Sequence, residues 1–104
     1  MDNLLNDIKS ELNINWDDSN TDKKLVSIIK NGKAYLTDIA GVDEIDFTEE
    51  GIARSLLFDY CRYRNSHAIE MFEENFRGQL LRLNNKYQAK VFLEGKSDLN
   101  ENKI

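Results

Sequence analysis

The chain has 104 residues, and its 19 acidic against 14 basic side chains give a net charge of -5. This length suits a single domain with one modest core. The sequence has neither an apolar run long enough to cross a bilayer nor the layout of a signal peptide, so we expect a soluble, intracellular protein without membrane contact. One cysteine excludes an internal disulfide, and no paired Cys or His spacing indicates zinc.

Charge is unevenly divided along the chain. Residues 1–50 carry 12 acids and 5 lysines, whereas residues 51–104 carry 7 acids and 9 basic side chains, including every arginine. Such a division suits head-to-tail contacts between identical copies, because a heterologous interface joins two different surfaces. It is equally compatible with charges that only keep the protein soluble.

The first predicted helix covers residues 3–12, and a connector with the only tryptophan, Trp16, follows it. We expect Ile14 and Trp16 to fold back over the bundle and Trp16 to be largely buried. The connector leads into "NWDDSNTDKKL" at residues 15–25. A calcium loop from Asp18 would need glycine at Lys23 and glutamate at Ile29, so that reading fails. The segment instead supplies an N-cap for the next helix, from Asp18, Ser19 or Thr21.

The second predicted helix covers residues 21–40 and ends at Gly41. Gly32 lies in the middle of its apolar stripe, where a glycine costs about 1 kcal/mol of helix propensity. We therefore expect another helix to pack closely against Gly32. The loop 41–47 follows, and Thr48 in "TEEG" is expected to cap the third helix.

The third predicted helix covers residues 49–64, and one ridge on it falls outside the core stripe. Arg54, Phe58 and Arg62 are spaced by four residues, so an aromatic ring lies between two guanidinium groups. Phe and Arg are both enriched at interfaces, which makes this ridge a candidate subunit contact. Cover by the first helix would account for Phe58 equally well.

A fourth helix is predicted over residues 66–83. The segment beyond it fits both a strand period and a helical period, so the pattern leaves its structure open. The predicted fold is all-α, a small bundle of about four helices over residues 1–85, with a flexible C-terminal tail at 86–104.

Catalytic and metal-binding patterns are weak. Cys61 and His67, with Asp59 to orient the base, stand across a predicted helix boundary, which favours a core cysteine over a nucleophile. "HAIE" at residues 67–70 reverses the Glu-x-x-His order of di-iron bundles and has no second copy. We expect no enzyme, no cofactor and no metal. "CRYRNS" at residues 61–66 allows a small DNA-binding or regulatory helical protein as an alternative, although an acidic chain argues against phosphate binding.

The order of four segments resembles that of the small head-tail connector (adaptor) proteins of long-tailed bacteriophages and prophages. The resemblance covers about residues 3–87 and comprises "LLNDIKSELNI", "GKAYLTDIAG", "IARSLLFDYCRYRNS" and "FEENFRGQLLRLN". It implies a structural virion protein that assembles into a ring, expected to be a dodecamer, under the portal protein. The ring would dock the next neck or tail protein, and the genome DNA would pass through it without sequence-specific binding.

The resemblance also implies a place and a set of contacts for the chain. The protein would reside in the host cytoplasm before assembly and in the virion neck afterwards. In such a ring, the ridge of Arg54, Phe58 and Arg62 is expected to meet acidic residues of the next subunit, for which the candidates are Asp43, Glu44 and Asp46. The C-terminal segment is expected to bind the portal, with the candidates Tyr87, Val91, Phe92 and Leu93.

Overall fold

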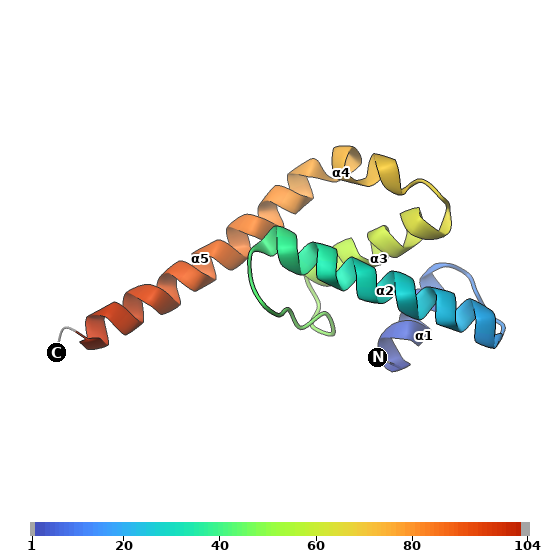
Figure 1. The fold of residues 1–104 in the computed structure, drawn as a ribbon, viewed down its shortest axis with the longest axis horizontal. Coiled ribbons are helices and arrows are strands. Elements are labelled where there is room, and N and C mark those ends of the chain that lie inside the picture. The colour runs from blue at the N-terminus through green and yellow to red at the C-terminus, as the bar shows by residue number, and fades with distance from the viewer. Residues whose placement is uncertain (1, 103–104) are drawn as a thin grey trace.

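The computed structural model describes the backbone of residues 2–102 and the side chains of residues 4–94. Over this range the chain is helical and contains no strand, which confirms the all-α class. The elements are α1 (Asp2–Glu11), α2 (Ser19–Ala40), α3 (Ile52–Asn65), a 3-10 turn (Ile69–Met71), α4 (Phe72–Asn75) and α5 (Arg77–Asn102). Figure 1 shows α2 packed along α3, α1 at one end, and α5 leaving the bundle at the other.

Both ends of α2 follow from local chemistry. Asp18 is the N-cap, and its carboxylate accepts a hydrogen bond from the backbone N–H of Thr21 at 3.2 Å. Gly41 ends the helix in the left-handed conformation, with φ of 71°, which glycine adopts without steric cost. The predicted cap and stop are therefore confirmed.

Gly32 is the point where α2 and α3 approach each other. A Cβ at this position would lie 2.7 Å from Cδ1 of Tyr60 and 2.8 Å from Cδ1 of Leu57. The expectation of a close helix contact is confirmed, because only the missing side chain makes room for these two residues.

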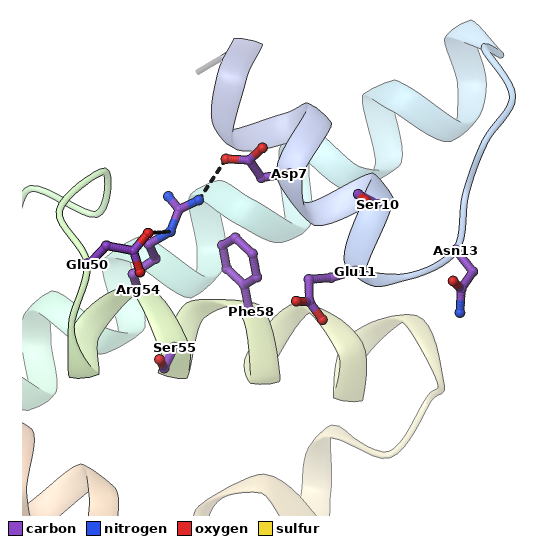
Figure 2. Close-up of a pocket in the computed structure, with 8 residues that line it drawn as sticks. All are labelled: Asp7, Ser10, Glu11, Asn13, Glu50, Arg54, Ser55 and Phe58. Atoms are coloured by element: carbon purple, nitrogen blue, oxygen red, sulfur yellow. Dashed lines mark hydrogen bonds and ion pairs between the residues drawn. The ribbon is translucent and has the colours of Figure 1, made fainter.

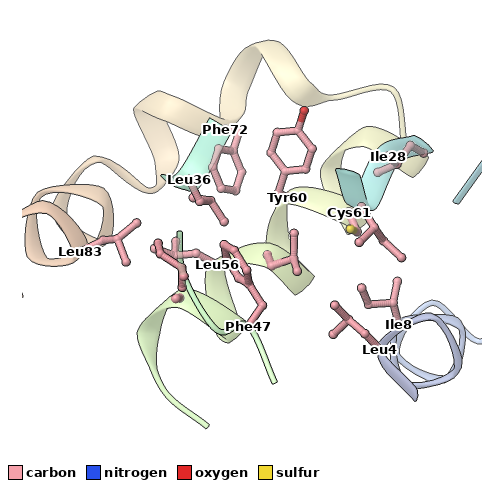
Figure 3. Packing of buried hydrophobic residues seen from close by; sticks show 14 of the residues in the cluster. Leu4, Ile8, Ile28, Leu36, Phe47, Leu56, Tyr60, Cys61, Phe72 and Leu83 are labelled. Carbon is pink, nitrogen blue, oxygen red and sulfur yellow. The ribbon is translucent and has the colours of Figure 1, made fainter. Parts of the chain in front are cut away.

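The core is one cluster, formed mainly by α2 and α3 and closed by α1 and by the segment from Phe72 to Leu83 (Figure 3). Phe72 is its largest fully buried side chain. Its ring lies edge-on to those of Tyr60 and Tyr63, with centroids 5.6 Å apart in both cases. Such aromatic pairs add to the stabilisation that burial of their surface already gives.

Three local predictions were wrong. Trp16 is 53% exposed, although Ile14, which was predicted to fold back with it, is buried. The third helix begins at Ile52, after Gly51, because Thr48 hydrogen-bonds to the Asp46 carboxylate in a turn and does not cap a helix. The fourth predicted helix is divided into a 3-10 turn, α4 and α5, with a break at Phe76.

The segment after Leu83, for which the pattern left strand and helix open, is helical. α5 runs without interruption from Arg77 to Asn102, so the predicted boundary at residue 85 falls inside one helix. Its described C-terminal part projects away from the other helices (Figure 1). The end of the predicted tail, residues 103–104, lies outside the described residues. Among the described residues, no helix combines the length and the apolar content needed to span a membrane.

Candidate interaction surfaces

The ridge on α3 is covered in part by α1. Arg54 donates a hydrogen bond to the Asp7 carboxylate at 2.7 Å and another to the carbonyl oxygen of Phe47 at 3.3 Å. Its guanidinium carbon lies 4.7 Å from the centroid of the Phe58 ring. Figure 2 shows the Phe58 ring between Arg54 and the residues of α1. The structure therefore places Arg54 and Phe58 in a contact within one chain, which is the second of the two predicted alternatives.

The remaining candidates for the subunit contact lie apart from the contact between α1 and α3. Arg62 pairs with Asp59 one turn earlier on α3. Asp43, Glu44 and Asp46 are exposed on the loop between α2 and α3. The hydrogen bonds from the Thr48 hydroxyl and N–H lower the pKa of Asp46, so this carboxylate stays charged at neutral pH.

Two amide side chains fix α5 to the C-terminal end of α2. Asn84 donates a hydrogen bond to the carbonyl oxygen of Ile39 at 3.0 Å, and Gln88 donates one to that of Ala40 at 2.7 Å. Tyr87, between them, is half-buried against the core cluster. Burial, then the charges of Glu49 and Asp46, raises the pKa of its hydroxyl. Of the four candidate portal residues, Tyr87 thus already packs against the core of its own chain.

Beyond Gln88 the helix has no such anchors among the described residues, and we call residues 89–102 the arm. Val91, Phe92 and Leu93 expose 45%, 67% and 63% of their surface. Three consecutive exposed apolar side chains are unusual on a free helix, and such patches mark interaction sites. The sequence placed these residues in a candidate binding segment, and the structure leaves them accessible.

Sequence reasoning missed the surface at the opposite end of the molecule. There Lys9 of α1 lies between two acids, with its Nζ 2.9 Å from Asp22 of α2 and 3.2 Å from Asp17 of the connector. The hydrogen bond to Asp22 is the main cause that raises the pKa of Lys9. These two ion pairs fix the connector to α1, and Trp16 stays exposed to solvent. A lysine within the apolar stripe of the first predicted helix was the available signal.

The candidate catalytic pair is not assembled. Cys61 is fully buried, and burial raises the pKa of its thiol to about 12, so no thiolate nucleophile forms near neutral pH. His67 is exposed in the turn after α3, with φ of 58°. In the described part of the chain, no group of three or more His, Cys, Asp or Glu side chains is placed to hold a metal ion.

No protein-family model, curated protein or solved structure matches the chain.

Proposed function

We propose that the chain is a structural head-tail connector of a bacteriophage or prophage, which forms a ring under the portal and docks the next neck or tail protein. The observation that carries this proposal is the arm. A small bundle anchors one helix through Asn84 and Gln88, and beyond them this helix projects from the bundle with Val91, Phe92 and Leu93 exposed. This is the arrangement expected of an adaptor whose partner is another protein.

The arm would supply the portal contact through Val91 and Phe92. Both side chains are exposed, so they can be buried by a partner without rearrangement of the bundle. In this proposal the protein waits in the host cytoplasm and then becomes part of the virion neck. The net charge of -5 would keep the genome DNA from adhering to the ring as it passes through the channel.

Electron microscopy of the chain mixed with the portal protein of the same phage tests the proposal. A ring bound to the portal, with a dodecamer expected, would support it. The double variant Val91→Ser/Phe92→Ser should lose attachment, because it removes the apolar contact and keeps the helix. Leu81→Ser is the matched control, since Leu81 is a comparably exposed residue of α5 that lies outside the arm.

Two results would contradict the proposal. The first is a portal that stays undecorated at a large excess of the wild-type chain. The second is tight, salt-dependent binding of the isolated chain to DNA, which would favour the regulatory alternative.

A further inference from the structure

The long axis of the molecule, 58 Å in extent, ends in two surfaces of different chemistry. At one end the connector between α1 and α2 exposes Trp16 beside Asp17. Toward the other end, α5 exposes Leu93 on the arm and a row of basic residues that begins before the arm. Figure 1 places the connector and the arm at opposite ends of the ribbon. Each surface combines a large apolar side chain with charge. A carboxylate, Asp17, stands beside Trp16, with Lys23 and Lys24 exposed farther along α2, whereas only basic residues form the row on α5.

The basic row, which we call the basic stripe, consists of Arg82, Lys86 and Lys90. These residues are spaced by four along α5, so they share one side of the helix, and Leu93 continues that side. All are exposed. The ammonium groups of Lys86 and Lys90 each lie 5.7 Å from the centroid of the Tyr87 ring. Neither lysine pairs with a carboxylate among the side chains that the structure describes.

The connector end has a carboxylate that can accept a further cation. Lys9 is satisfied by Asp22, whose carboxylate is the closer of its two partners at 2.9 Å. Asp17 is also within reach of Lys9, yet its side chain remains fully exposed and accessible to a further cation. Trp16, next to Asp17, has an indole ring that can pack against an aliphatic side chain or accept a cation on its face.

We infer that the basic stripe and Leu93 of one copy dock on Trp16 and Asp17 of the next copy. This inference rests on the proposed ring-forming role and names the surfaces that would join its subunits. Opposite charges orient the encounter, and burial of a tryptophan supplies the kind of anchor that dominates interfaces. Because the two surfaces differ and lie at opposite ends, the contact is heterologous and repeats from copy to copy. It assigns Leu93 to the neighbouring copy and leaves Val91 and Phe92 to the portal.

Two variants separate the halves of this contact. Trp16→Ser removes the acceptor and keeps the basic stripe, whereas Lys86→Glu/Lys90→Glu reverses the stripe and keeps the acceptor. Each variant alone should be monomeric by sedimentation velocity. Mixed in equal amounts, they should form dimers and nothing larger, because each dimer has one intact junction and two disabled ends. The wild-type chain should continue to larger assemblies as its concentration rises.

The tryptophan gives an independent readout. Trp16 is the only tryptophan of the chain, so in the mixture all indole emission comes from the Lys86→Glu/Lys90→Glu variant. Its emission should shift to shorter wavelength as the Trp16→Ser variant is added. The control is Lys30→Glu/Arg77→Glu, which makes the same charge change on exposed basic residues of α2 and α5 that belong to neither surface and should assemble like the wild type.

The inference is overturned if the wild-type chain stays monomeric at about 1 mM, a concentration at which even weak contacts are populated. It is also overturned if the mixture of variants stays monomeric while the wild type assembles, since the junction would then lie elsewhere. Electron microscopy with the portal separates this outcome from failure of the proposed function. Portal rings that form normally with Lys86→Glu/Lys90→Glu would remove the inference alone, whereas self-association without portal binding would remove the proposed function alone.

Discussion

Gln88 on α5 donates a hydrogen bond of 2.7 Å to the carbonyl oxygen of Ala40, the last residue of α2. A helix leaves its last four carbonyl groups without a partner inside the helix. In α2 the backbone N–H of Gly41 donates hydrogen bonds to two of these carbonyl groups. The side chain of Asn84 donates to the third, and that of Gln88 donates to the fourth. The end of α2 is thus closed by a helix more than 40 residues later in the chain, and the direction of α5 is fixed by this closure.

Replacement of these amides should loosen α5. We expect Asn84→Ala and Gln88→Ala each to lower the free energy of unfolding by about 1 kcal/mol, because each leaves a helix carbonyl without its partner. Urea unfolding measures the change. Asn85→Ala is the control, since Asn85 is exposed on the same helix and makes none of these bonds. Equal effects of all three changes would show that the amides do not hold the two helices together.

Two glycines in helices should respond in opposite ways to alanine. Gly32→Ala should cost about 1–3 kcal/mol, because the new methyl group would meet the Tyr60 ring at 2.7 Å and must displace it. Gly78→Ala should be neutral or stabilising by up to about 1 kcal/mol, since nothing lies within 4 Å of the added atom and alanine favours the helix. Thermal unfolding of the two variants checks the pair. A stable Gly32→Ala protein would contradict the close packing of α2 and α3.

Local rules account for the parts of the fold that were correctly predicted. The Asp18 cap, the Gly41 stop and the close approach at Gly32 each depend on the conformational chemistry of one residue and its neighbours. The errors concern contacts between distant segments. Whether Trp16 enters the core together with Ile14 depends on how Lys9 holds the connector, and that geometry has no signature in a helical period.

The interaction surfaces were predictable only in part. The assignment of Val91, Phe92 and Leu93 to a binding segment follows from the sequence, because polar sequence surrounds this short apolar run. The exposure of Trp16 and the basic stripe could not be derived in the same way, since both depend on where the two ends of the bundle point. The position of Phe58 under α1 was one of two alternatives that only the fold could separate.

Phe58 should be important for the stability of the monomer. It packs against the core cluster from its place between Arg54 and α1, so Phe58→Asp should lower the free energy of unfolding by about 2 kcal/mol or more. Phe92→Asp makes the same change on the exposed arm and should stay within about 0.5 kcal/mol of the wild type. Urea unfolding compares them. A fully stable Phe58→Asp chain that no longer self-associates would support the ridge of Arg54, Phe58 and Arg62 as the subunit contact.

Cys61 should make stability depend on alkaline pH. Burial raises the pKa of its thiol from 9.0 to about 12, so above pH 9 the unfolded chain loses this proton and the folded chain keeps it. The unfolded state then binds fewer protons, and stability falls as pH rises, by up to about 1.4 kcal/mol per unit. The comparison is urea unfolding of the wild type and Cys61→Ala between pH 8 and 11. Every other ionisable group is common to the two proteins, so its contribution cancels. Parallel profiles would show that Cys61 is not shielded from water.

Two truncations should separate the arm from the anchor that holds it. Removal of residues 91–104 keeps Tyr87 and Gln88, so the bundle should unfold at nearly the same urea concentration as the full chain while portal attachment is lost. Removal of residues 86–104 also deletes these two side chains, which bury an aromatic ring and close the end of α2. That chain should be destabilised by about 2–3 kcal/mol, the sum of one hydrogen bond and part of one aromatic burial.

The difference between the two truncations is the informative quantity, because both lack the arm. Equal stability of the two chains would mean that α5 stops contributing to the bundle before Lys86. Normal portal decoration by the shorter deletion would move the docking surface from the arm to the bundle.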